Sequence, residues 1–276
     1  MKAKLDYQQQ EFIIDFSRGE SLGIPLDGKS SPQFFIDYPL KKSRLNVTGF
    51  SGSVASGAGC NVEQISFTPH CHGTHTEGSG HISPAAETVQ SLINQTPCPA
   101  QLISISPQPA AECNEDYSQQ LPADYPLLSL AALQLQLQVT FGDNKLGNGA
   151  LIIRCLPNSQ EKLGRDYNLH PHYPLLTTAA IKWLAASGLQ HLLVDSPSLD
   201  YANDGGSLSN HRHWWGLYRS ANIPNDAINR SLTEMIYVAD SIPDGAYWLE
   251  LNISNLESDA SPSNPKIYPL QLSQSQ

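Results

Sequence analysis

The order of hydrophobic and polar positions predicts a strand, a helix and a second strand in the middle of the chain. Residues 150–156 are almost entirely apolar, which is typical of a strand buried on both faces. Residues 175–187 carry apolar side chains at helical spacing, and Gly188 is placed to end that helix. Residues 191–195 form a second apolar run. Two such strands joined by a helix are expected to lie parallel in one sheet, with a right-handed crossover.

Weaker patterns predict the remaining elements. Residues 127–139 fit either a helix or a strand, because leucine and glutamine alternate in the second half of this segment. We find neither an internal repeat nor a low-complexity linker, so we expect residues 1–276 to form a single α/β domain. Further strands are expected at residues 11–16, 61–69, 102–105, 247–253 and 267–270, and short helices at residues 84–94 and 225–233.

Composition and charge restrict the class of protein. The chain has 276 residues, of which 40% are hydrophobic and 15% charged, as expected of a globular protein with a sizeable core. Its net charge of −10 argues against binding nucleic acid or an anionic membrane, and suits an enzyme that acts on a small molecule. No apolar run approaches the ~20 residues of a membrane span, and the first ten residues are polar, unlike a secretory signal. The five dispersed cysteines fit reduced thiols in a cytoplasmic protein.

Residues 69–81 concentrate side chains that bind transition metals. These thirteen residues include four of the nine histidines, one cysteine, one glutamate and three glycines. Each glycine lowers helix propensity by about 1 kcal/mol relative to alanine, which favours an extended chain. Alternate side chains of an extended chain point to opposite faces. The stretch therefore predicts a metal site, and the candidates that share one face are Cys71, His75, Glu77 and His81, with His70 and His72 on the other.

Two later segments are expected to contribute to the same site. Asp195 stands at the carboxyl end of the second predicted parallel strand, where open α/β sheets place ligand-binding groups, although a capping role is equally compatible. A polar, glycine-containing loop follows and leads to His211 and His213. A second pair of histidines after such a loop is the natural source of further metal ligands.

The histidine-rich stretch resembles the signature of a known family. Its pattern, Cys71-x-Gly73-Thr74-His75-x-Glu77-x3-His81, is similar to the H-x-G-T-H-x-D-x-P-x-H of the cyclase family of metal-dependent hydrolases, which includes bacterial kynurenine formamidases. Residues 194–200, His211-Arg212 and residues 259–262 resemble later segments of the family. The resemblance covers roughly residues 45–270, which leaves the first 45 residues and the C-terminal tail as extensions. It implies a swivelling β/β/α fold with a mixed sheet and flanking helices, and a homo-oligomer, either a dimer or a tetramer.

The resemblance also implies roles for individual residues. His81 takes the place of the family's acid/base histidine and is the expected catalytic residue. The expected metal ligands are Cys71, His75, Glu77, His211 and Glu234, with Glu77 in the place of a metal-bridging aspartate and Glu234 as the final carboxylate. These groups would hold one or two divalent ions.

Three departures from the signature separate this chain from kynurenine formamidase itself. Cysteine replaces histidine at position 71, and this softer ligand favours Zn²⁺, while Mn²⁺ stays an alternative. Glutamate replaces aspartate at position 77, which lengthens the bridging side chain by one methylene, and Ser79 replaces proline. We therefore expect a hydrolase of another small amide, lactone or ester that uses metal-activated water.

Three alternatives remain open from the sequence. A Cys71 nucleophile with His75 or His81 as its base would also hydrolyse such substrates. A protein that binds a metal or a small molecule without turnover would hold its ion in a closed shell of four ligands. His70 or His72, in place of Cys71, is a further candidate for the first metal ligand.

Overall fold

The computed structural model describes residues 1–7, 10–28, 30–84, 88–218 and 222–272. Its centre is a mixed sheet with the strand order β1-β2-β18-β16-β9-β12-β14-β15-β8-β17, to which β3 adds by pairing with β18. The strands of this sheet are β1 (Lys2–Tyr7), β2 (Gln10–Asp15), β3 (Glu20–Ser21), β8 (His75–Glu77), β9 (Cys98–Ile105), β12 (Ala150–Cys155), β14 (His191–Val194), β15 (Ser231–Glu234), β16 (Gly245–Glu250), β17 (Ala260–Pro262) and β18 (Lys266–Leu272). This arrangement confirms the predicted α/β class.

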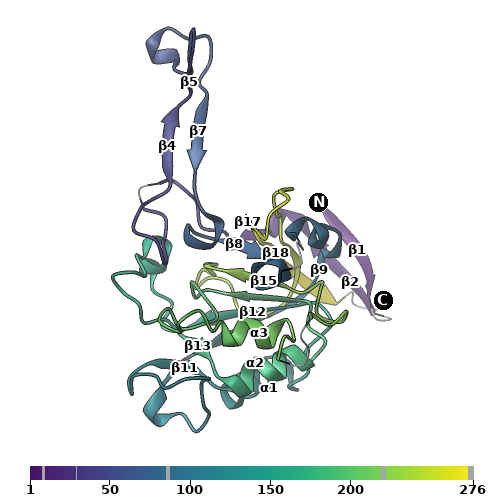
Figure 1. The fold of residues 1–276 in the computed structure, drawn as a ribbon. Helices are drawn as coiled ribbons and strands as arrows, with labels where there is room; N and C mark the ends of the chain where they lie inside the picture. The colour runs from purple at the N-terminus through teal and green to yellow at the C-terminus, as the bar shows by residue number, and fades with distance from the viewer. Residues whose placement is uncertain (8–9, 29, 85–87, 219–221, 273–276) are drawn as a thin grey trace.

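Three α-helices lie together beside the sheet (Figure 1), and small sheets and short 3-10 helices complete the fold. The α-helices are α1 (Leu130–Phe141), α2 (Thr178–Ala186) and α3 (Ser209–Trp214). The small sheets combine β10 (Gln108–Pro109) with β11 (Pro126–Leu128) and β13 (Leu175–Leu176), β4 (Lys41–Arg44) with β7 (Glu63–Ser66), and β5 (Asn46–Val47) with β6 (Phe50–Ser51). No helix among the described residues is long and apolar enough to cross a bilayer.

The strand–helix–strand prediction is confirmed by β12, α2 and β14. The two strands pair in parallel, with Ala150 opposite His191 and Ile153 opposite Val194. Alternate residues of β12 belong to different cores: Leu151 packs with the helices, whereas Ile152 packs on the opposite face of the sheet. Because both faces are covered, the strand has an almost continuous apolar sequence.

Other predicted elements were resolved or corrected. The ambiguous segment 127–139 is mainly helix α1, whose first turn is capped by the Ser129 hydroxyl accepting from the Ala132 amide. The helix expected at 225–233 is wrong, because this segment makes turns that lead into β15. The strand expected at 61–69 forms as β7, but it belongs to a projecting hairpin and not to the main sheet. The helix expected at 84–94 is a 3-10 helix from Val89 to Gln95, and residues 85–87 lie outside the described residues.

Candidate metal centre

Strand β8 presents His75 and Glu77 on one face, two residues apart. It lies between β15 and β17, with His75 directly opposite Glu234 and Glu77 opposite Leu232. Directly opposed side chains on antiparallel strands meet on the same face of a sheet. Accordingly, His75 Nε2 lies 3.4 Å from Glu234 Oε2. The alternation expected from the sequence thus holds over the three residues of β8.

Helix α3 brings His211 to the same place. Its Nε2 lies 3.1 Å from Glu77 Oε1 and 3.7 Å from Glu234 Oε1. All four side chains are almost fully buried, at 3% exposure or less for His75, Glu77, His211 and Glu234. Two histidines and two carboxylates from three separate elements therefore converge in the interior.

Two 3-10 helices beside β8 add two further histidines. The first, Pro69–Cys71, places His70 Nδ1 2.9 Å from Glu77 Oε2. The second, Ser79–His81, places His81 Nε2 3.9 Å from the same oxygen. The His70 and His81 rings stack with their centroids 4.1 Å apart. Glu77 is therefore common to two compact sets of potential metal ligands, which are His70, Glu77 and His81, and His75, Glu77 and Glu234.

The donor set fits a divalent cation. Nε2 of His75 and both carboxylate oxygens of Glu77 are buried and have no hydrogen-bond partner of good geometry among the described residues. Leaving a buried polar atom unpaired costs about 1–3 kcal/mol, and more for a charged group. A cation among these atoms would satisfy all three, and imidazole and carboxylate are ligands of Zn²⁺ and Mn²⁺.

Outer partners fix the orientation of the candidate ligands. His75 Nδ1 donates to the Gly73 carbonyl at 3.0 Å, and His211 Nδ1 donates to Asp200 Oδ2 at 2.6 Å. These bonds leave Nε2 of both rings directed at the centre, as in metal sites where the second ring nitrogen is held by a carbonyl or carboxylate. Glu234 Oε1 accepts from the Leu199 amide at 2.9 Å.

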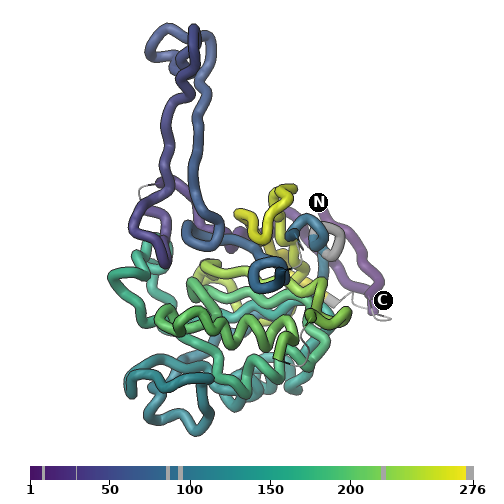
Figure 2. Tube along the Cα trace, viewed as in Figure 1, coloured from purple at the N-terminus to yellow at the C-terminus, as the bar shows by residue number. Residues whose placement is uncertain are grey.

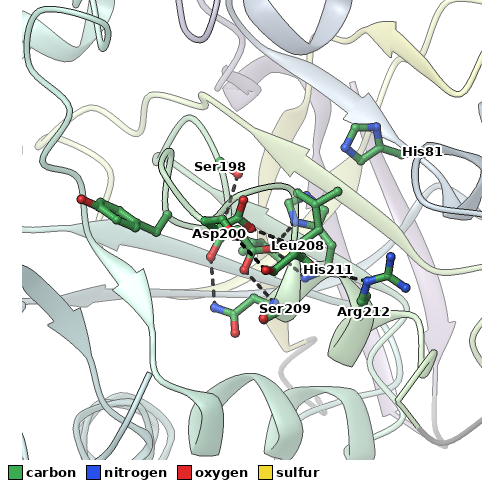
Figure 3. A network of polar contacts seen from close by, with 12 residues as sticks. His81, Ser198, Asp200, Leu208, Ser209, His211 and Arg212 are labelled. Carbon is green, nitrogen blue, oxygen red and sulfur yellow. Dashed lines mark hydrogen bonds and ion pairs between the residues drawn. The ribbon is translucent and has the colours of Figure 1, made fainter. Parts of the chain in front are cut away.

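Asp200 is the hub of this support. Figure 3 shows it between Ser198 and His211, with His81 on the far side of His211. Besides binding the His211 ring, the Asp200 carboxylate accepts from the backbone amide of Asn210 at 2.8 Å and from the Tyr117 hydroxyl at 2.8 Å. Burial alone would raise the pKa of Asp200, but His211 and the backbone amide of Asn210 hold that pKa below its ordinary value. Asp200 therefore stays ionised and keeps His211 in one orientation.

The electrostatics of the centre favour a carboxylate surrounded by positive charge. Burial opposes ionisation of Glu77, yet His81, His211 and His70 hold its pKa well below the ordinary range. Burial likewise lowers the pKa of His70, but the neighbouring carboxylates of Asp259 and Glu77 outweigh it and raise that pKa to about 10. Asp259 Oδ2 lies 2.9 Å from His70 Nε2 and 3.7 Å from His81 Nδ1. Asp259 thus links the two histidines on the side away from Glu77.

The predicted site residues are largely brought together. His75, Glu77, His81, His211 and Glu234 converge, and their individual roles stay predictions. Cys71 is buried and lines the adjacent pocket, but it belongs to neither compact set of ligands. His70, which the sequence offered only as an alternative to Cys71 for the first ligand, also lies at the centre. Asp200 and Asp259 were given no role from the sequence, although they lie in segments that carry the family resemblance.

Three other candidates have structural roles. Asp195 accepts from the Cys155 amide at 2.8 Å and from Lys162 Nζ at 2.7 Å, so it joins two strand ends, a structural role other than the helix or turn cap that the sequence left open. The His213 ring packs against the Tyr218 ring at a tilt of 33°, with ring centroids 4.2 Å apart, and His213 is not part of either ligand set. His72 Nε2 donates to the Tyr38 carbonyl at 2.9 Å, and its Nδ1 faces the Thr68 backbone.

A pocket of about 690 Å³ opens onto the centre. The residues of the centre that line it are His70, Glu77, His81, His211 and Glu234, and the loop of residues 200–208 also borders it. Its apolar side includes Phe34, Phe35, Pro197 and Leu208. A small molecule with an apolar part and a polar reactive group matches a pocket that is lined by both apolar and polar side chains.

Solved structures with the same fold include metal-dependent hydrolases. Isatin hydrolase A from Labrenzia aggregata, bound to benzyl benzoate, has a TM-score of 0.63 and 13% identity, covering 91% of this chain and 93% of that one. Isatin hydrolase A from Ralstonia solanacearum has a TM-score of 0.58 and 16% identity, covering 91% of each. A predicted metal-dependent hydrolase from Bacillus stearothermophilus has a TM-score of 0.56 and 13% identity, covering 91% of this chain and 98% of that one.

The family model described as putative cyclase matches residues 20–201. The chain therefore belongs to the cyclase family, as its sequence signature indicated. No curated protein sequence matches it. The low identity to the solved structures agrees with the divergent signature at positions 71, 77 and 79.

Removing the charge of Asp200 should weaken metal binding without removing a ligand. We expect Asp200→Asn to raise the dissociation constant for Zn²⁺ about 10–100-fold, because His211 loses the carboxylate that orients its ring. Competition with a chromophoric chelator measures this constant. Asp143→Asn, at an exposed bend after α1, is the matched control and should leave this constant unchanged. Equal affinities in Asp200→Asn and the wild type would show that Asp200 does not support a ligand.

Proposed function

We propose that this protein is a metal-dependent hydrolase of a small amide, lactone or ester. The observation that carries the proposal is the pair of ligand sets that share the buried carboxylate of Glu77. His75, Glu77, His211 and Glu234 would hold one ion, and His70 with Glu77 a second, with Zn²⁺ as the preferred metal and Mn²⁺ as the alternative. Such ions polarise a carbonyl group and lower the pKa of water to about 7.

The chain's own residues would supply positioning and proton transfer. His81 is 24% exposed in its side chain and lines the pocket, whereas His75 and His211 are buried. A ring that contacts both Asp259 and the pocket is suited to carry a proton to the leaving nitrogen or oxygen. The apolar side of the pocket would hold the remainder of the substrate and limit access of water.

The site geometry supports turnover over metal storage. A storage site closes its coordination shell with four protein ligands, whereas a catalytic site keeps a position open to a substrate. Here the pocket of about 690 Å³ reaches His70, Glu77, His81 and His211 directly. We also propose a cytoplasmic location, supported by the odd number of dispersed cysteines.

The thiol of Cys71 is poorly suited to act as a nucleophile. Burial raises its pKa to about 11, which leaves little thiolate at neutral pH in the metal-free protein. The Cys71 thiol makes no hydrogen bond to any described histidine, so the structure offers it no base. This alternative is therefore not favoured.

The experiment that tests the proposal is a hydrolase screen over N-formyl amides, lactones and esters with the metal-loaded protein. We expect at least one class to be hydrolysed, with activity lost after chelation and restored by Zn²⁺ or Mn²⁺. Activity that survives complete removal of metal would contradict the proposal.

Replacing His81 by alanine tests whether this residue transfers a proton or binds the metal. We expect His81→Ala to lower kcat about 10²–10⁴-fold with metal content unchanged, because general acid/base groups contribute rate enhancements of this size. His213→Ala, which alters a histidine of the same chain outside the site, should leave both quantities unchanged. Loss of metal in His81→Ala would instead assign His81 as a ligand.

Two variants decide whether His70 or Cys71 is the metal ligand at the start of the histidine-rich stretch. His70 Nδ1 lies 2.9 Å from Glu77, whereas Cys71 is in neither ligand set. We therefore expect His70→Ala to lose metal affinity and Cys71→Ala to retain it, as measured by metal content after dialysis. Loss of metal in Cys71→Ala alone would restore cysteine as the ligand that the family signature suggests.

A further inference from the structure

Most of the strained backbone among the described residues lies at the pocket or beside its metal ligands. The residues other than glycine with positive φ are Phe35 (φ 69°), Leu208 (φ 46°), Met235 (φ 53°) and Asn252 (φ 50°). Phe35 and Leu208 line the pocket, and Met235 directly follows Glu234. A large apolar residue is costly in this conformation, whereas asparagine tolerates it. Such strain persists where the surrounding structure holds it, and it gathers at functional sites.

Phe35 is the central residue of a tight turn, in the segment that leads to the projecting hairpin at the top of Figures 1 and 2. The Ile36 amide donates to the Phe34 carbonyl at 2.9 Å. With positive φ at the residue between them, this bond defines the rarer and strained form of γ-turn. The Phe34 amide donates to the Cys71 carbonyl at 3.0 Å, and the Phe34 ring meets Tyr173 edge-on. Phe34 is thus anchored to the body, whereas Phe35 lines the pocket while 73% exposed.

Leu208 is held in its strained conformation by hydrogen bonds on both sides. Its φ and ψ are 46° and 48°, in the left-handed helical region. The Asp204 carboxylate accepts from the Leu208 amide at 2.6 Å and from the Gly206 amide at 2.7 Å. The Arg212 amide donates to the Leu208 carbonyl at 2.9 Å. Glycine would adopt this conformation without strain, as Gly205 and Gly206 do just before it, so a leucine here indicates that its side chain has a use.

Leu208 also lies next to a candidate metal ligand. Figure 3 shows it beside His211, which follows three residues later in α3. The Leu208 side chain is half-buried and lines the same pocket as Phe35. The two residues therefore offer apolar surface to one small molecule from segments that are far apart in the sequence. Such surface favours an apolar group, because contact removes that group from water.

We propose that Phe35 and Leu208, called the clamp here, bind the apolar part of the substrate and give the pocket its preference for substrates with a large apolar group. This proposal rests on the proposed function, since it assigns the reacting group of the substrate to the metal centre and the rest of the molecule to the clamp. Both are specificity-determining residues that leave the reacting atoms to the histidines and carboxylates. The strained backbone that places them lowers the stability of the fold.

Calorimetric titration of the zinc-loaded, full-length protein with two hydroxamates tests the clamp. Acetohydroxamate and benzohydroxamate carry the same metal-binding group and differ in a methyl against a phenyl substituent. We expect benzohydroxamate to bind the wild type about tenfold tighter or more. Phe35→Ala and Leu208→Ala should each reduce this ratio about fivefold, with the affinity for acetohydroxamate unchanged, because each leaves part of the phenyl group in water. Leu135→Ala, at an exposed position on α1 away from the pocket lining, is the matched control.

Glycine variants separate a binding role from a structural one. Phe35→Gly and Leu208→Gly remove the same side chains as the alanine variants and also relieve the backbone strain. We expect them to lose the preference for benzohydroxamate to the same extent. Their melting temperatures should equal or exceed those of the alanine variants, because alanine is still strained at positive φ. A side chain that only supports the fold would not show this combination.

The outcomes distinguish failure of the clamp from failure of the metal centre. A zinc-loaded wild type that binds neither hydroxamate would contradict the proposed function and the clamp together. Binding of both hydroxamates, with the wild-type ratio of affinities kept in Phe35→Ala and in Leu208→Ala, would overturn the clamp alone.

Discussion

Replacing Glu77 by alanine is expected to abolish metal binding and with it hydrolytic activity. Glu77 is common to both ligand sets, and three histidines (His70, His81 and His211) lie within 3.9 Å of its oxygens. Alanine leaves no oxygen for either ion. The loss of metal affinity should therefore exceed the ~10–100-fold loss expected from removing an outer partner such as Asp200. Metal content and kcat/KM of the purified variant measure the two effects.

Glu161→Ala provides the control for the Glu77 variant. It also replaces a glutamate by alanine, but at an exposed position in a 3-10 helix outside the site. It should keep wild-type metal content and activity. A Glu77→Ala protein that still carries its full complement of metal would show that the ligand sets are not joined through this carboxylate.

Removing the metal is expected to lower thermal stability substantially. The metal-free centre holds buried atoms of His75 and Glu77 without hydrogen-bond partners, and a bound ion pairs them. A ligand present at 1,000 times its dissociation constant stabilises the folded state by about 4.1 kcal/mol. For a chain of this size that corresponds to a fall in Tm of about 10 °C on chelation.

Differential scanning calorimetry with and without chelator measures this change. The Glu77→Ala protein serves as the internal control, because it should melt at the same temperature in both conditions. Identical melting temperatures for the stripped and loaded wild type would argue against a metal in the core of the site.

The elements whose local pattern of hydrophobic residues follows directly from their burial could be predicted from the sequence. Strands β12 and β14 are buried on both faces, so their sequences are apolar throughout, and α2 shows helical periodicity because one of its faces packs on them. The helix that the same local pattern predicted at residues 225–233 is wrong. Ala227 is buried, but turns after Pro224 replace a helix, and the chain then joins the sheet where the Ser231 amide donates to the Gln190 carbonyl.

The metal centre was predictable only in part, for a geometric reason. The two-residue period is correct for His75 and Glu77 because both lie in β8. It fails at Pro69–Cys71, where a 3-10 helix rotates the chain, whereas His81 in the second 3-10 helix still lies beside Glu77, as alternation predicted. As a result, His70 lies beside Glu77, on the face that alternation assigned to Cys71.

The outer partners of the centre could not be derived from local sequence. Asp200 and His211 are eleven residues apart, yet an intervening loop and the start of α3 bring them to 2.6 Å. Asp259 meets His70 across 189 residues. Only the resemblance of their segments to a known family marked them, and it assigned neither a role.

The central claim is that the histidines and carboxylates around Glu77 hold a divalent cation. Elemental analysis by mass spectrometry of protein purified without added metal tests it most directly. The structure predicts at least one Zn²⁺ or Mn²⁺ per wild-type chain and none in the Glu77→Ala chain. A folded wild-type protein that hydrolyses its substrate while containing no transition metal would contradict the claim.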